Sequence, residues 1–79
     1  MKNNVIPLHQ LPLGAFARVK RLTHNGSLRR RMLDLGLIKD TTVVALRKSP
    51  AGDPIAYEIR GAVIALRCEE ASKVLVELI

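Results

Sequence analysis

The sequence predicts a small, mainly β domain, in which about five short antiparallel strands form a barrel and one short helix follows the first long strand. Several segments alternate apolar and polar residues, which is the period of a strand. A single segment, near residues 28–35, places its apolar residues at helical spacing. The chain has 79 residues, enough for one domain, and a sheet of this size removes its exposed edges by closing on itself.

The first long strand is predicted at residues 16–22, where both alternating sets mix apolar and basic side chains. Its inner face is therefore expected to be imperfect. Residues 1–10 lack a clear period and are predicted to form a lead-in segment, ordered in part by Ile6 and Leu8. The domain proper is expected to span residues 11–79.

The helix is predicted to begin at Ser27, whose side-chain oxygen can accept from the free N–H groups of the first turn. Leu28, Met32 and Leu35 then fall on one face. Gly36 follows where a helix end favours a left-handed residue, and the next residue, a leucine, is placed to close the cap with an apolar contact.

The second half of the chain is predicted to consist of four strands joined by a loop and turns. Residues 49–54 contain two prolines and a glycine and must form a loop. Residues 68–72 are too few for a helix of ordinary length and are predicted to form a single turn. The four strands expected here are residues 41–48, 55–60, 62–67 and 73–78.

The charge of the chain favours anionic partners. Thirteen Lys and Arg against seven Asp and Glu give a net charge of +6, and residues 18–31 hold six basic residues and no acid. Such a surface attracts nucleic acid, lipid head groups or an acidic protein face. The competing interpretation is that these charges serve solubility alone.

Cysteine content and hydropathy predict a cytoplasmic location. With Cys68 as the single cysteine, no intrachain disulfide can form, which fits a reducing compartment. The first ten residues have no apolar core of a signal peptide, and no apolar run approaches the ~20 residues of a membrane-spanning helix.

No catalytic or cofactor site emerges from the sequence. His9, His24, Met32 and Cys68 do not pair at a metal-ligand spacing, so no metal or other cofactor is expected. His24 is expected to decorate a turn and Cys68 to pack at the end of a strand. No serine lies in a G-x-S-x-G elbow, and the glycines are too dispersed to cradle a phosphate. The chain is therefore predicted not to be an enzyme.

Nucleic-acid binding is the main competing hypothesis, because small basic barrels often bind it. Single-strand binding usually couples basic grooves to aromatic stacking platforms. The aromatic residues here are Phe16 and Tyr57, and both are expected on the apolar faces of strands. The charge fits this function and the stacking surface does not.

Two motifs identify a family resemblance. Residues Arg30 to Gly36 spell R-R-x-L-x-L-G at the end of the helix, and Pro50 to Ile55 spell P-x-G-D-P-I in the loop. With these two motifs in this order, the chain resembles the FeoA family from Leu11 to Leu78. The members of this family are small cytosolic proteins of bacterial ferrous-iron uptake. One departure is Asp40, where the family usually has glycine; Asp tolerates the left-handed region better than most residues, so the turn is expected to survive.

The resemblance implies an SH3-like barrel and a partner. That partner is the membrane ferrous-iron transporter FeoB, through its cytosolic G-protein region, with modulation of transport or GTP hydrolysis. The chain is further expected to be a monomer or weak oligomer in the cytoplasm, recruited to the inner face of the membrane. The barrel resembles as well the C-terminal domain of metal-dependent repressors, a transition-metal alternative. That alternative requires the chain to be a fragment, and an initiating Met1 with a short lead-in argues against it.

Two candidate contact surfaces remain. The exposed helix face carries three consecutive arginines, which can pair with carboxylates or phosphates on a partner. The loop offers the second surface, although its residues are also those that a tight turn requires. The partner-binding candidates are Arg29, Arg30, Arg31, Pro50, Gly52, Asp53 and Pro54.

Overall fold

The computed structural model describes residues 5–79 as six strands and two helices, with a short 3-10 turn, η1. The mainly β prediction, with a helix after the first long strand, is confirmed. No helix in the described part of the chain is both long and apolar enough to cross a membrane. The elements are β1 (Val5–Pro7), η1 (Leu8–Gln10), β2 (Phe16–Leu22), α1 (Gly26–Asp34), β3 (Thr42–Lys48), β4 (Ile55–Ile59), β5 (Ala62–Leu66), α2 (Cys68–Ala71) and β6 (Val74–Leu78).

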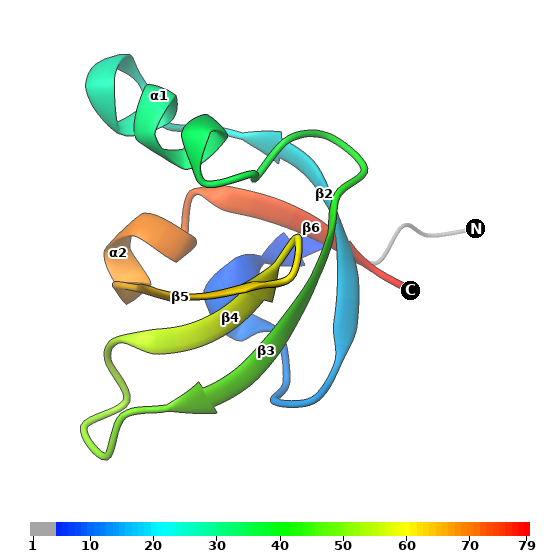
Figure 1. The fold of residues 1–79 in the computed structure, drawn as a ribbon, viewed down its shortest axis with the longest axis vertical. Coiled ribbons are helices and arrows are strands. Elements are labelled where there is room, and N and C mark those ends of the chain that lie inside the picture. The colour runs from blue at the N-terminus through cyan, green and yellow to red at the C-terminus, as the bar shows by residue number, and fades with distance from the viewer. Residues whose placement is uncertain (1–4) are drawn as a thin grey trace.

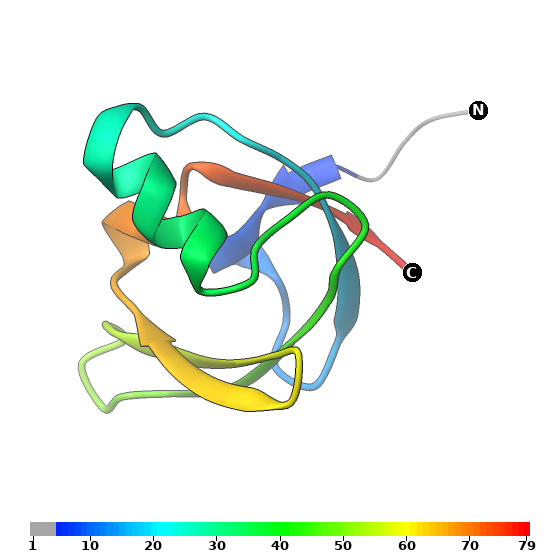
Figure 2. The ribbon, with the colours of Figure 1, turned by 45° about the horizontal axis from the view of Figure 1, so that its top comes forward.

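The strands form one antiparallel sheet in the order β1-β6-β2-β3-β4-β5. The sheet curls around the core, and α1 lies over one open end of it, beside α2 (Figures 1 and 2). No pairing among residues 5–79 joins β1 to β5, so the sheet keeps two edges. The expected closed barrel of five strands is therefore a curled, open sheet of six.

The extra strand comes from the segment expected to be a lead-in. Residues 1–4 lie outside the described part, but residues 5–7 pair with β6, and Leu8 is fully buried. The prediction missed strand β1, whereas the expected ordering of this segment by Ile6 and Leu8 agrees with their packing in or against the core. Pro7 has no N–H to donate, and it fits because β1 is an edge strand.

β2 contains a β-bulge. The register against β6 shifts between Val19 and Arg21, so Lys20 has no partner of its own. The extra residue moves the alternation by one position and bends the strand. Val19 and Leu22 are both buried, whereas Lys20 and Arg21 between them both lie outside the core. The bulge accounts for the mixed apolar and basic pattern of this segment.

The two aromatic residues, Tyr57 and Phe16, differ in burial. Tyr57 is fully buried, as expected, and its hydroxyl donates to the carbonyl of Leu8 at 3.3 Å. Burial raises the pKa of Tyr57, and the neighbouring Cys68 adds to the effect. Phe16 is 56% exposed, so its expected place on an inner face is wrong. It begins β2 with its side chain on the outer surface of the sheet.

α1 begins earlier than predicted and ends as predicted. Its N-cap is Asn25, which makes no side-chain capping bond, so the assignment of Ser27 as the cap is wrong. At the other end, Gly36 has φ +105, and its N–H donates to Leu33 while the N–H of Leu37 donates to Met32. This is a Schellman cap, in which the buried Leu37 joins the same core as the helix.

The turn that precedes β3 survives without its glycine. Asp40 has φ +73, in the left-handed region, and its N–H donates to the carbonyl of Val19 at 2.7 Å. The N–H of Val19 in turn donates to Thr41 at 2.9 Å. These backbone bonds hold the turn against the centre of β2, which confirms that aspartate is tolerated here.

The helix end provides a test of packing. A Cβ added at Gly36 would lie 2.8 Å from Cδ of Arg60, and the residue has a positive φ. We expect Gly36→Ala to lower the free energy of unfolding by about 2 kcal/mol or more, combining backbone strain with a close contact. Gly14 also has a positive φ, but nothing lies within 4 Å of its added Cβ. Gly14→Ala should therefore cost about 1 kcal/mol. Equal losses in urea unfolding would contradict this account.

Candidate functional site

The three helix arginines are exposed, as predicted, but they are not equivalent. Arg29 donates from Nη1 to the carbonyl of Leu22 at 3.1 Å, which fixes α1 to the end of β2. Arg31 forms an ion pair with Glu70 of α2. Within residues 5–79, no hydrogen bond or ion pair engages Arg30. Arg29 and Arg31 therefore hold α1 against the rest of the fold, whereas the guanidinium of Arg30 is exposed and makes no such contact with residues 5–79.

Glu70 joins the two helices. One carboxylate oxygen accepts from Arg31, and the other accepts from the backbone N–H of Arg67 at 3.1 Å. Burial raises the pKa of the Glu70 carboxyl, but the bonds from Arg31 and Arg67 outweigh it and hold the pKa below its usual value. Glu70 is therefore ionised at neutral pH and ties α1 to α2.

His24 supports the same junction from inside. It is 3% exposed, and its Nε2 lies 2.8 Å from the carbonyl oxygen of Glu70, to which it donates. Its Nδ1 is buried and makes no hydrogen bond to any described residue. His24 lies between β2 and α1, as expected, but its ring does not merely decorate that segment, because it is buried and bonds to the backbone of α2.

The predicted loop is also tied to α2. The carboxylate of Asp53 accepts from the N–H of Cys68 at 2.9 Å, and the thiol of Cys68 lies 3.4 Å from the carbonyl of Gly52. Cys68 itself is half-buried at the start of α2, one residue after the end of β5, close to its expected place. Asp53 therefore caps a helix, and Gly52 supplies its positive φ of +87 to the turn.

The remaining loop residues line a surface hollow of about 390 Å³. Pro50 is exposed and Pro54 is half-buried, and two cationic residues of β3 border the same hollow. Its lining is Arg47, Lys48, Ser49, Pro50, Pro54, Ala56 and Ala65. The loop thus offers a shallow depression with a basic rim.

The two candidate surfaces are brought to one side of the molecule. α2 lies between α1 and the tip of the β3–β4 hairpin, away from both chain ends (Figure 1). It is joined to α1 through Arg31 and to the hairpin through Asp53. The arginine face and the loop therefore form one continuous side, which we call the α2 side. Sequence reasoning missed Glu70, whose role arises from contacts with residues distant in the chain.

Comparison with known proteins identifies the family. The family model of the FeoA domain matches residues 6–78. The chain belongs to the FeoA family. A curated relative from Porphyromonas gingivalis, a fusion of Fe(2+) transport protein A with the Fe(2+) transporter FeoB, is 35% identical over 72 residues. The match covers 91% of this chain and 8% of the relative, so the chain spans less than a tenth of that protein's length.

Solved structures agree with this FeoA assignment. An FeoA-like protein from Clostridium acetobutylicum is 32% identical, with a TM-score of 0.88, covering 100% of this chain and 91% of that one. FeoA from Stenotrophomonas maltophilia, complexed with zinc and described as a prokaryotic SH3 domain protein, is 31% identical. Its TM-score is 0.77, with 96% of this chain and 89% of that chain covered. The expected SH3-like fold is confirmed.

The repressor resemblance holds at the level of the fold. A manganese-dependent transcriptional repressor matches this FeoA chain with a TM-score of 0.87 at 18% identity, over 100% of this chain and 44% of that one. Within the described residues, no group of three or more His, Cys, Asp or Glu side chains is arranged to hold a metal ion. The likeness to the repressor is therefore one of fold alone.

The Glu70 junction is expected to make the free energy of unfolding depend on pH in the acid range. Because folding lowers the pKa of the Glu70 carboxyl, its stabilisation of the fold is fully present above the ordinary carboxyl pKa of about 4.3. That stabilisation is lost as the pH falls through the lowered pKa. Because Arg31 is half exposed, we expect Glu70→Gln to cost about 1 kcal/mol at neutral pH. The difference from wild type should shrink below about pH 4 in urea unfolding.

The exposed neighbour Glu69 provides the control, because its carboxylate makes no hydrogen bond to a described residue. Glu69→Gln should change stability by less than about 0.5 kcal/mol at any pH. A Glu70→Gln deficit that stays constant into acid would contradict the proposed junction.

Proposed function

We propose that this chain is an accessory protein of bacterial ferrous-iron uptake. In this proposal it binds the cytosolic G-protein region of an FeoB-type membrane transporter and modulates transport or GTP hydrolysis. It acts from the cytoplasm, is recruited to the inner face of the membrane by that contact, and is a monomer or weak oligomer. Its role is to bind rather than to catalyse.

The observation that carries this proposal is the fused relative. In that protein an FeoA-like segment and the transporter FeoB share one chain. Fusion holds two modules at a high effective concentration, which favours a contact between them even when it is weak. A separate chain of the same family is expected to make the same contact without the tether.

The α2 side is the surface best suited to that contact. Arg30 is exposed and has no partner within residues 5–79, so its guanidinium can pair with a carboxylate on the transporter or with a phosphate of its bound nucleotide. Pro50 and Pro54 present the adjoining hollow with its basic rim. Arg29, Arg31, Gly52 and Asp53 act by holding this surface in shape.

Nucleic-acid binding is the alternative that the structure leaves to experiment. Phe16 is exposed, so one aromatic ring is available for stacking. Phe16 is a single exposed ring, because Tyr57 is buried. Binding of a single strand usually uses several aromatic rings, on which successive bases stack. We therefore favour a protein partner and treat oligonucleotide binding as an outcome of the test.

The test is a titration of the chain with the transporter's cytosolic G domain, free of nucleotide and with GDP or a GTP analogue. We expect saturable binding in at least one nucleotide state. Arg30→Glu should weaken it about tenfold or more, because the reversed charge then faces acidic groups of the partner.

The matched control is Arg21→Glu, which makes the same charge change on β2, outside the α2 side. It should leave the affinity within about twofold, which corresponds to less than 0.5 kcal/mol. The proposal fails if the G domain does not bind in any nucleotide state, or if random oligonucleotides bind and the G domain does not.

A further inference from the structure

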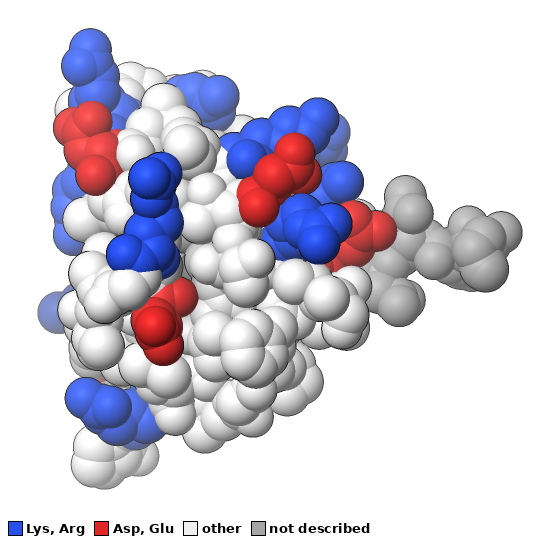
Figure 3. All heavy atoms as spheres, turned by 45° about the vertical axis from the view of Figure 1, so that its right-hand side comes forward, with Lys and Arg blue, Asp and Glu red and all other residues white. Residues whose placement is uncertain are grey.

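The bulge in β2 creates a second basic surface, separate from the α2 side. In a regular strand, consecutive side chains point to opposite faces. Because the register shifts at Lys20, both Lys20 and Arg21 lie outside the core while Val19 and Leu22 are buried. Two adjacent cations therefore share one face of the sheet. Figure 3 shows Lys and Arg side chains gathered on this face, close to the described start of the chain, with acidic side chains among them.

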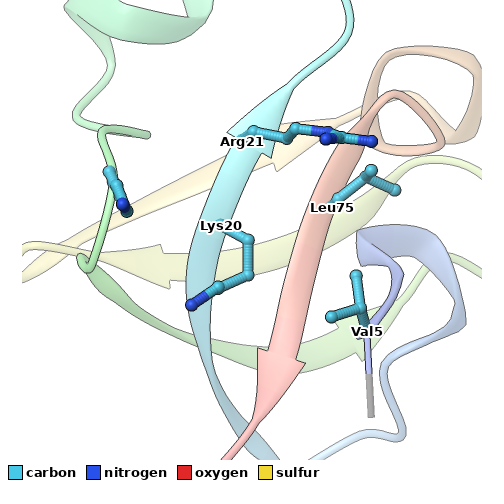
Figure 4. A pocket seen from close by; sticks show the side chains of 5 residues that line it. Val5, Lys20, Arg21 and Leu75 are labelled. Carbon is cyan, nitrogen blue, oxygen red and sulfur yellow. The ribbon is translucent and has the colours of Figure 1, made fainter. Parts of the chain in front are cut away.

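These cations border a hollow of about 300 Å³. Lys20 and Arg21 come from β2 and Lys39 from the turn before β3, while Val5 and Leu75 supply its apolar lining. Figure 4 shows Arg21 extending from β2 across β6, on the same side as Leu75 and Val5. The hollow is wide enough for a phosphate group with part of its substituent.

The charges around the hollow are only partly neutralised by the protein. Lys20 pairs with Glu77 at 3.3 Å. Arg21 and Lys39 make no ion pair with any described residue. The other charged residues nearby are Arg18, which lies opposite Glu77 in the sheet, and Asp40, which follows Lys39. Four cations against two acids leave this face with an excess of positive charge.

Exposed apolar side chains adjoin the cations. Val5, in the lining, is 39% exposed, and Ile38, next to Lys39 in the chain, is 41% exposed. Cations that attract phosphates beside apolar groups that enter the headgroup region are typical of proteins that lie on an anionic membrane. No aromatic ring lines the hollow, so it lacks the stacking contact that a nucleic acid would use.

We propose that the hollow formed by Lys20, Arg21 and Lys39 binds a phosphate, and that the phosphate is the headgroup of an anionic phospholipid. The chain then lies on the membrane through its β2 face, while the α2 side stays open for a protein partner. This inference does not depend on the proposed transporter contact, because it concerns this chain and lipid alone.

The test is cosedimentation with vesicles that contain no protein. We expect binding to vesicles of phosphatidylethanolamine and phosphatidylglycerol, weakening as salt rises, and none to phosphatidylcholine vesicles. Each cation near such a surface contributes about fivefold to partitioning. Replacing both Arg21→Glu and Lys39→Glu should therefore reduce binding more than about 20-fold. The double variant Arg21→Gln with Lys39→Gln removes the two charges without reversing them. It should also weaken vesicle binding, and it replaces the charge-reversed variant in the test if that variant does not fold.

The matched control is Arg47→Glu with Lys48→Glu, which changes the net charge equally at the opposite end of β3. It should lose no more than about fivefold through the general loss of charge. Equal losses in the two double variants, or no binding to anionic vesicles, would overturn the proposal. Saturable binding of inorganic phosphate or an oligonucleotide at Arg21 and Lys39, without vesicle binding, would also overturn it.

Discussion

One extra residue in β2 sets the geometry of this molecule. Lys20 has no partner on β6, so the strand bends and its alternation moves by one position. Leu22 thereby turns into the core, and its carbonyl meets the guanidinium of Arg29 from α1. The same shift leaves Lys20 and Arg21 together on the outer face. Without the bulge, Leu22 would face solvent and this part of β2 could not bury its apolar residue.

α2 has a comparable role on the other side, although it is a single turn. The carboxylate of Glu70 accepts from Arg31 of α1, and its backbone carbonyl accepts from His24. The N–H of Cys68 donates to Asp53 of the hairpin. A helix of four residues is too short to be stable alone, and these contacts supply what its length does not. The molecule thus has two distinct basic surfaces, the α2 side, which we propose meets a protein partner, and the β2 face, which we propose meets an anionic membrane.

Local pattern was enough to predict the regular parts of the fold. The clean alternation of β4 and the Schellman end of α1 depend on neighbours in sequence, and both were confirmed. β1 was missed because three residues with a proline carry no period, and it is ordered by pairing with β6. The candidate site was found only in part. Asp53 and Arg31 look like surface residues in sequence, and their partners on α2 lie far along the chain.

The bulge at Lys20 separates the buried residues of β2 from its cationic ones, and the register of β2 against β6 measures this bulge directly. Cross-strand nuclear Overhauser effects between β2 and β6 should place Val19 opposite Val76 and Arg21 opposite Leu75, with Lys20 unpaired. The backbone N–H of Val19, which donates to Thr41, should be strongly protected from hydrogen exchange. A continuous register that sets Lys20 opposite Leu75 would contradict the account.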